Sequence, residues 1–224
     1  MIELSDIRRS YQVGDETVQA LRGVSLRIEA GEYVSIMGPS GSGKSSLLNV
    51  LGLLDRPNSG RYSLDGRDVT GLSDDELARV RREKIGFVFQ FFHLVPRLTA
   101  ARNIELPMVL AGIVPTERDR RLQVLLQQYG LENRASHRPD QLSGGQCQRV
   151  AIARAMSMQP PVILADEPTG NLDRTTGQDV MALLEGLHAA GGTLVMVTHD
   201  AELGNRAQRR LRIVDGQVVA DERG

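Results

Sequence analysis

Apolar and polar residues alternate along the first 28 residues of the chain. Ile2, Leu4 and Ile7 begin this alternation, and it returns from Val18 to Ile28. A period of two places successive side chains on opposite faces of a strand. The stretch is therefore predicted to form antiparallel strands, and residues 61–69 are predicted to form another strand pair.

Four short apolar runs have a different pattern, because almost every position in them is hydrophobic. These strand-like runs are Tyr33–Met37, Ile85–Phe89, Val162–Ala165 and Thr193–Val197. Helical spacing follows two of them, over residues 45–54 and near residues 175–189. Buried strands that alternate with helices are typical of a parallel sheet covered on both faces.

The middle of the chain is predicted to be mainly helical. A charged helix spans 74–84 after the capping residue Ser73, and residues 99–129 include an amphipathic helix opened by Thr116. The chain closes with a hairpin whose turn is Asp215-Gly216. We therefore expect one α/β domain over residues 1–224, with a mainly parallel sheet, an amino-terminal antiparallel β subdomain and a helical subdomain inserted at approximately 91–158.

Composition narrows the class of protein. The 224 residues are 41% hydrophobic and 25% charged, as in globular domains, and the net charge of −1 disfavours a nucleic-acid binder. The single cysteine, Cys147, excludes an intrachain disulfide and is expected to be an inert helix residue. The first residues do not resemble a signal peptide, and no apolar run reaches about 18 residues. We expect a cytoplasmic protein whose membrane role, if any, requires a partner.

Two groups of arginines are expected to be solvated. Arg79, Arg81 and Arg82 are assigned to an exposed helix face, and Arg209, Arg210 and Arg212 to an exposed strand edge.

A glycine-rich segment follows the strand at 33–37 and precedes the helix at 45–54. Its sequence, Gly38-Pro39-Ser40-Gly41-Ser42-Gly43-Lys44-Ser45, matches the phosphate-binding pattern G-x-x-x-x-G-K-[ST]. Glycines let backbone N–H groups approach phosphate oxygens, and the helix N-terminus adds a partial positive charge. Lys44 is expected to reach the β- and γ-phosphates of ATP and the Ser45 hydroxyl to bind Mg²⁺. The match predicts a P-loop NTPase core.

Two acids end the apolar strand at 162–165. Asp166 is placed to hold Mg²⁺, and Glu167 to activate the attacking water. A surface acid pair that merely closes a strand is the alternative. Both acids lie at the carboxyl end of a predicted parallel strand, where ligands bind in such sheets, and this position favours the functional interpretation.

A second glycine-containing segment, Leu142-Ser143-Gly144-Gly145-Gln146, precedes a helix-like run. A hydroxyl residue and two glycines at a helix start form an anion site, although a plain helix cap is the simpler alternative. Here the chain resembles the ATP-binding-cassette (ABC) ATPases, whose signature is LSGGQ. The resemblance covers essentially the whole chain.

The resemblance implies roles for several residues whose side-chain chemistry alone does not establish a role. Tyr11 would stack on adenine, Gln90 would contact Mg²⁺ or water, and His199 would contact the γ-phosphate; each could otherwise be a structural residue. The implied catalytic residues are Lys44, Gln90, Glu167 and His199, and the implied Mg²⁺ ligands are Ser45, Gln90 and Asp166. The implied nucleotide-binding residues are Tyr11, Gly38, Pro39, Ser40, Gly41, Ser42, Gly43, Lys44, Ser45, Ser46, Ser143, Gly144, Gly145, Gln146 and Asp173.

The resemblance also implies a homodimer. In this family the phosphate loop of one subunit and the signature of the other enclose the same ATP. One sequence would then provide two equivalent sites by two-fold symmetry.

The segments 87–108, 53–60 and 167–173 are similar to the macrolide-exporter and lipoprotein-releasing branch of the family. This likeness implies a separately encoded membrane permease of the MacB, LolC or LolE type, with the ATPase on the cytoplasmic face of the inner membrane. The lack of a fused membrane segment and of a carboxy-terminal regulatory region fits that expectation. A regulatory ATPase that signals through a membrane partner stays open as an alternative, and an ABC ATPase acting on DNA or ribosomes is disfavoured.

Overall fold

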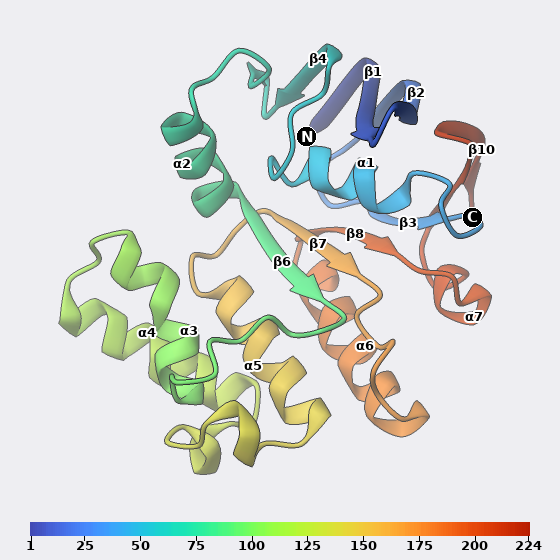
Figure 1. Cartoon of the computed structure of the whole chain (residues 1–224). Helices are drawn as coiled ribbons and strands as arrows, with labels where there is room; N and C mark the ends of the chain where they lie inside the picture. Colours follow the sequence, from blue (N-terminus) through green and yellow to red (C-terminus); the bar gives the residue numbers. More distant parts are fainter. The chain divides into compact units, whose positions relative to one another are not determined.

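The computed structural model describes residues 1–224, which divide into two compact units. The first contains Met1–Arg81 and His188–Gly224, and the second contains Arg82–Leu187. Figure 1 shows the course of the chain. None of its helices combines the length and apolar character needed to cross a membrane.

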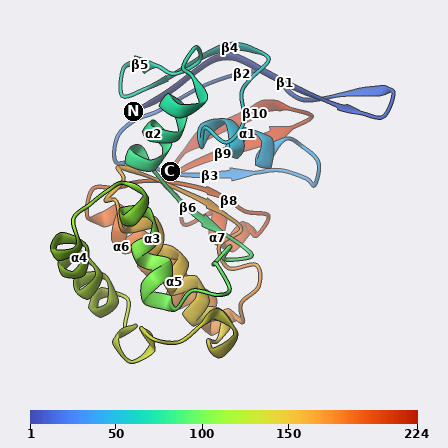
Figure 2. The same cartoon turned by 60° about the vertical axis from the view of Figure 1, so that its left-hand side comes forward.

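The first unit begins with the predicted antiparallel strands. β1 (Ile2–Val13) pairs with β2 (Glu16–Ile28) and with β4 (Ser59–Leu64), which in turn pairs with β5 (Arg67–Asp68). Alternate residues of β1 and β2, such as Ile7 and Val24, are buried, so the period-two prediction is confirmed. Beyond β4 the first two strands continue as a two-stranded ribbon (Figure 2).

Parallel strands form the other layer of the first unit. Their order is β10 (Gln217–Arg223), β9 (Arg209–Val214), β3 (Tyr33–Met37) and β8 (Thr193–Val197), with β3 parallel to both neighbours and β9–β10 an antiparallel hairpin. The helix α1 (Lys44–Leu51) lies between β3 and the antiparallel strands (Figure 1). Its buried leucines fill that interior. The short helix α7 (Ala201–Gly204) follows β8.

The helix α2 (Asp74–Lys84) runs across one boundary between the units. Ser73 and Glu76 form the cap, since the Glu76 amide donates to Ser73 Oγ and Glu76 Oε2 accepts from the Ser73 amide. The prediction of a helix capped by Ser73 is confirmed.

In the second unit, β6 (Ile85–Phe89) and β7 (Val162–Asp166) form a parallel pair. The helix α5 (Gly144–Met156) packs on β6 and on α3 (Ala100–Leu110), and α3 packs on α4 (Pro115–Gln128). Two short 3₁₀ turns, Glu132–Arg134 and Pro139–Gln141, connect α4 to α5. The helix α6 (Arg174–Ala189) runs across the second boundary. The predicted parallel strands and helices are therefore present.

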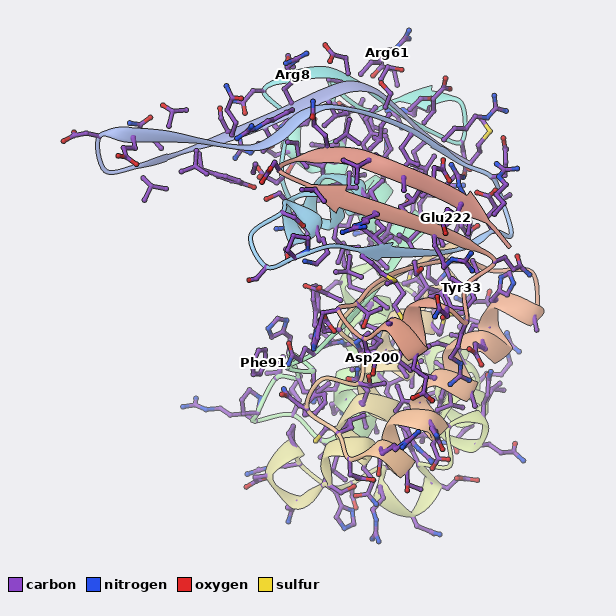
Figure 3. All side chains as sticks on the ribbon, turned by 90° about the vertical axis from the view of Figure 1, so that its right-hand side faces the viewer. Arg8, Tyr33, Arg61, Phe91, Asp200 and Glu222 are labelled. Carbon is purple, nitrogen blue, oxygen red and sulfur yellow. The ribbon has the colours of Figure 1, made fainter.

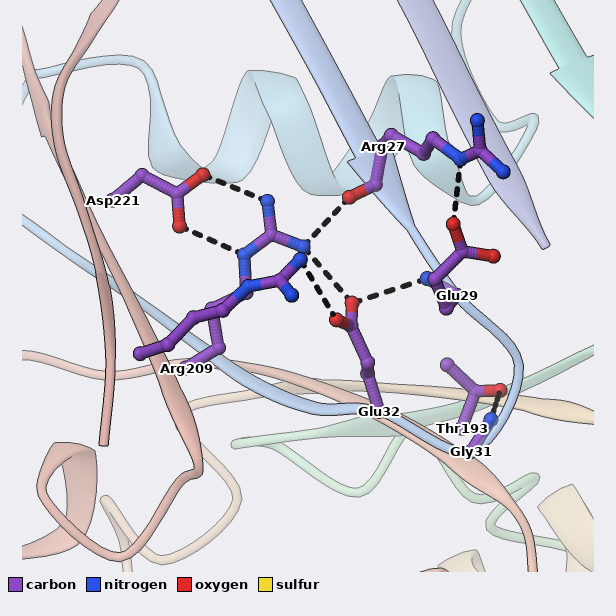
Figure 4. A network of polar contacts seen from close by, with 8 residues as sticks. Arg27, Glu29, Gly31, Glu32, Thr193, Arg209 and Asp221 are labelled. Atoms are coloured by element: carbon purple, nitrogen blue, oxygen red, sulfur yellow. Dashed lines mark hydrogen bonds and ion pairs between the residues drawn. The ribbon is translucent and has the colours of Figure 1, made fainter.

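The expectation that Arg209 lies at an exposed strand edge is wrong. Its side chain is buried and forms a bidentate ion pair with Asp221, with bonds of 2.7 Å from Nε and Nη2. Nη1 also contacts Glu32 Oε2 at 2.9 Å and the Arg27 carbonyl at 2.6 Å (Figure 4). A guanidinium can be buried when carboxylates and carbonyls satisfy its fork of donors, and here they do.

The helix arginines also depart from expectation. Arg81 and Arg82 are half-buried, and each donates to a backbone carbonyl, that of Leu53 at 2.6 Å and that of Leu110 at 3.4 Å respectively.

Candidate functional site

The glycine-rich loop in the first unit has a backbone that other residues could not adopt. Gly38 and Gly43 have φ angles of +156° and +102°. A Cβ on Gly38 would collide with the Ile213 carbonyl, and one on Gly43 with the Ala20 carbonyl. The glycines of the motif are thus required by close approach of neighbouring backbone, as well as by the left-handed conformation at Gly43.

The loop ends at the start of α1, where the first amide groups of a helix have no partners within the helix. Lys44 is the first residue of α1, and Lys44 Nζ donates to the carbonyls of Gly38 at 2.9 Å and Pro39 at 2.8 Å. The lysine charge therefore lies directly beside the loop. The Ser42 hydroxyl is buried there without a hydrogen-bond partner. This combination of amides and one cation fits a polyphosphate.

Exposure differs between the two serines that follow the lysine. Ser45 is exposed in the first turn of α1, whereas Ser46 is half-buried. The exposed Ser45 hydroxyl is available for a ligand.

His199 lies in the same unit, just beyond β8. It is exposed, and the residue before it is fixed because the Thr198 amide donates to the Ile36 carbonyl at 3.2 Å. His199 lines a cavity of about 550 Å³ together with Gly38 and Pro39. The structure thus brings this histidine to the beginning of the phosphate loop.

In the second unit, the acids and the glutamine gather at the carboxyl ends of two strands. Phe89 of β6 is the register partner of Asp166 of β7, so Gln90 follows at the same edge. Glu167 has a left-handed φ of +44°, which turns the chain out of β7 immediately after Asp166. Gln90 Nε2 donates to Asn171 Oδ1 at 3.3 Å, and Asn171 Nδ2 donates to the Gln90 carbonyl at 3.0 Å.

The signature segment forms the start of α5. Ser143 is the N-cap: Ser143 Oγ accepts from the Gln146 amide at 3.3 Å, and Gln146 Oε1 accepts from the Ser143 amide at 3.0 Å. Ser143 and Gly144 are exposed, whereas Gly145 is buried against the Thr176 side chain, where a Cβ would collide. Both interpretations of this segment, the cap and the anion site, are compatible with this geometry.

Asp173 caps the helix next to the signature. Its Oδ2 accepts from the Thr176 hydroxyl at 2.6 Å and its Oδ1 from the Thr176 amide at 3.0 Å. These two bonds, the hydroxyl first, hold the pKa of the Asp173 carboxyl below its usual range. Thr176 therefore touches both Gly145 and Asp173, two residues that the sequence analysis assigned to nucleotide binding.

The sequence analysis did not identify two polar residues of α5 that contact the backbone near the site. The fully buried Gln148 donates from Nε2 to the carbonyls of Pro168 at 2.6 Å and Phe89 at 3.3 Å, so it links the ends of β6 and β7. Arg154 donates to the carbonyls of Phe92 and His93. A polar residue among the apolar positions of a helix indicates a buried, hydrogen-bonded side chain, and this pattern could have identified them.

Cys147 lies beside Gln148 and is also buried, which raises the pKa of its thiol. A less acidic thiol is less reactive, in agreement with its expected inertness.

The profile of the family described as "ABC transporter" matches residues 21–170, more than half of the chain. The chain belongs to the ABC transporter family. Since its phosphate loop, paired strand-end acids and signature all occur in this fold, it is an ATPase of that family.

Relatives and solved structures agree with this assignment. The ABC transporter ATP-binding protein YvrO of Bacillus subtilis is 51% identical over 100% of this chain and 98% of its own length. The macrolide export ATP-binding/permease protein MacB of Rhodopseudomonas palustris is 54% identical over 98% of this chain, which spans 34% of that protein. A dimeric post-hydrolysis structure of the ATP-binding cassette MJ0796, bound to ADP and Pi, matches with a TM-score of 0.92 and 47% identity, covering 100% of this chain and 98% of that one.

Proposed function

We propose that two copies of this chain close around two ATP molecules and that the closure drives a membrane permease. The observation that carries the proposal is a second, exposed helix start in addition to that of α1. Ser143 and Gly144 begin α5 with their backbone near the surface, where a phosphate of a nucleotide bound to another copy can reach them. The structure of the cassette MJ0796, described as dimeric and bound to ADP and Pi, supports the dimer.

Each element of the site has a role in this proposal. Lys44 and the loop amides bind the β- and γ-phosphates, and His199 contacts the γ-phosphate. Glu167 accepts a proton from the attacking water, so its charge is needed for hydrolysis rather than for binding. Ser143, Gly145 and Asp173 of the other copy complete the nucleotide site.

The donor set also suits Mg²⁺, which prefers one or two carboxylates, oxygen ligands and substrate phosphates. Ser45 offers a hydroxyl, Gln90 an amide oxygen and Asp166 a carboxylate. When bound, Mg²⁺ neutralises charge on the phosphates.

For the partner, we propose a permease encoded separately and a role in export or lipoprotein release. The similarity to MacB, described as an ATP-binding/permease protein, supports the type of partner. The near-full-length match to YvrO, described as an ATP-binding protein, supports separate subunits. Such an ATPase would lie on the cytoplasmic face of the inner membrane through its permease.

Dimerisation can be tested with Glu167→Gln, which should bind ATP and hydrolyse it too slowly to reopen. We expect its molar mass by light scattering to double with ATP and Mg²⁺, and to remain that of a monomer in the double variant Glu167→Gln/Ser143→Arg. Equal dimer content with and without ATP, or a dimer unaffected by Ser143→Arg, would contradict the proposal.

The partner can be identified by trapping tagged Glu167→Gln with ATP in its native cells and purifying in mild detergent. A permease with few spans and a large extracytoplasmic domain is expected. A multi-span importer permease would refute the export assignment, and ribosomes or DNA-binding proteins without a permease would refute a transport role. Cargo flux with the recovered permease in vesicles would then distinguish transport from signalling.

A further inference from the structure

Asp55, which lies just after α1, holds two side chains of β1 with a single oxygen atom. Tyr11 Oη donates to Asp55 Oδ2 at 2.7 Å, and Arg9 Nε donates to the same atom at 2.7 Å. The Arg9 and Asp55 side chains are each 22% exposed, so this ion pair is partly shielded from solvent. Asp55 Oδ1 is engaged as well, because it accepts from the Arg56 amide at 2.9 Å.

Arg9 also covers one face of the Tyr11 ring. Its guanidinium carbon lies 4.5 Å from the ring centroid, which is a cation–π geometry. Asp55 fixes the hydroxyl, Arg9 covers one face, and Tyr11 is only half-buried. A planar group that stacks on the ring would therefore use the face opposite Arg9.

The backbone on either side of Tyr11 is hydrogen-bonded to residues 54–58, the segment after α1 that contains Asp55. The Ser10 amide donates to Asn58 Oδ1 at 2.7 Å, and the Asn58 amide donates to the Arg8 carbonyl at 2.8 Å. The segment itself is an extension of α1, because the amides of Leu54 and Asp55 both donate to the Asn49 carbonyl. Since α1 begins at Lys44, a continuous hydrogen-bonded path leads from the phosphate loop to the Tyr11 ring.

The geometry points to Asp55 and Arg9 as positioning residues that hold Tyr11 at a set place relative to the phosphate loop, so that it receives the base of a nucleotide. This inference rests on the proposed function as an ATPase and on the stacking of Tyr11 on adenine that the family resemblance implies. A ring that is already oriented loses little side-chain freedom on binding, and the base then adds more to affinity. Asp55 and Arg9 should therefore affect the part of the affinity that comes from the base, whereas the phosphate loop provides the part that comes from the phosphates.

The test compares the affinity for ATP with that for inorganic tripolyphosphate, which has the phosphates and no base. Base stacking should make wild-type protein bind ATP roughly 5- to 100-fold more tightly than tripolyphosphate. We expect Asp55→Asn and Arg9→Gln each to weaken ATP binding about 3- to 10-fold and to change tripolyphosphate binding less than about 2-fold.

Two further variants separate positioning from a general structural role. Arg8→Gln is the matched control, because Arg8 pairs with Asp6 on the exposed surface of the same strand (Figure 3) and should leave both affinities unchanged. In a Tyr11→Ala background, Asp55→Asn should cost nothing more, since the side chain it positions is gone.

The outcomes distinguish this inference from the proposed function. Equal loss of both affinities, or no loss of either, in Asp55→Asn would overturn the positioning role while the wild-type preference for ATP stood. If wild-type protein bound ATP no better than tripolyphosphate, stacking on Tyr11 and its positioning would both be refuted.

Discussion

Arg154 of α5 donates from Nη1 to the carbonyl of His93 at 2.6 Å. Its Nη2 donates to the carbonyl of Phe92 at 2.9 Å, and both carbonyls belong to residues with left-handed φ angles of +59° and +47° for Phe92 and His93. These residues lie two and three positions after Gln90, and the intervening Phe91 is 67% exposed and points outward (Figure 3). The signature helix thus holds an unusual backbone conformation next to a candidate site residue.

Replacing Arg154 by lysine should release that segment, because an ammonium group cannot donate to two carbonyls in the fixed geometry of a guanidinium. We expect Arg154→Lys to lower the free energy of unfolding in urea by about 2 kcal/mol. Amide hydrogen exchange over residues 90–94 should also become faster. Arg149→Lys is the control, because its 3.4 Å contact with Asp179 is exposed and should contribute less than about 1 kcal/mol. Equal effects of the two substitutions would contradict this account.

The proposed base should be needed for hydrolysis and not for binding. In Glu167→Gln we expect ATP affinity to stay near that of the wild type and turnover to fall by about 10²–10⁴-fold. Steady-state phosphate release and equilibrium binding measure the two quantities. The exposed Glu132 provides a control, since Glu132→Gln should leave turnover unchanged. Near-wild-type turnover in Glu167→Gln would rule out the assignment.

The close contact between Gly145 and Thr176 predicts a substitution and its rescue. A Cβ on Gly145 would collide with the Thr176 methyl group, so Gly145→Ala should destabilise the protein by about 1–3 kcal/mol. Thr176→Ser removes that methyl and keeps the hydroxyl that bonds Asp173, so the double variant should recover most of the loss. Urea unfolding gives the comparison.

Gly186→Ala serves as the control for that series. Gly186 lies in α6 with open space where a Cβ would be, so alanine there should stabilise the protein by about 0.5–1 kcal/mol. A double variant as unstable as Gly145→Ala would show that the methyl contact is not the cause.

The ion pair between Arg209 and Asp221 should make the stability of the protein depend on pH in the acidic range. Its hydrogen bonds to the Arg209 guanidinium hold the pKa of Asp221 below its usual range. A carboxyl whose pKa is lower in the folded state stabilises the protein above its unfolded pKa of about 3.9, and this contribution is lost as the pH falls through the folded value. We expect Asp221→Asn to lower Tm at pH 7 by about 2–4 °C.

Scans from pH 7 to pH 3 should show that difference in Tm shrinking below about pH 4. The control is Glu222→Gln, because Glu222 makes only a 3.4 Å exposed contact with Arg210. A gap between wild type and Asp221→Asn that stays constant with pH would mean that the pair is not responsible.

The main features of the fold follow from local pattern. Alternation along β1 and β2 and the continuous apolar runs of β3 and β8 specify strands, and the phosphate loop is recognisable because glycines are required at set spacings. The helix at 74–84 was predictable from Ser73, since a capping residue acts within a few positions of itself.

Residues whose partners are distant in sequence could not be predicted in this way. Arg209 looked like an exposed strand arginine, and its burial depends on Glu32, 177 residues away. Likewise Tyr11 was recognisable as a stacking candidate, whereas its bond to Asp55 joins residues 44 positions apart. A single sequence gives the chemistry of such residues but not the tertiary contacts that decide their role.

The phosphate loop is enclosed by both ends of its unit, and this has a consequence for synthesis on the ribosome. The Gly216 amide donates to the Ser42 carbonyl at 2.9 Å, the Arg22 amide donates to the Gly216 carbonyl at 2.9 Å, and Gly38 lies against Ile213. Chains emerge from the amino terminus and fold as segments become available. The loop is translated early, yet its surroundings are complete only when the hairpin of β9 and β10 has emerged. ATP binding should therefore be acquired only after residues 209–223 have left the ribosome, so that shorter nascent chains do not compete for nucleotide.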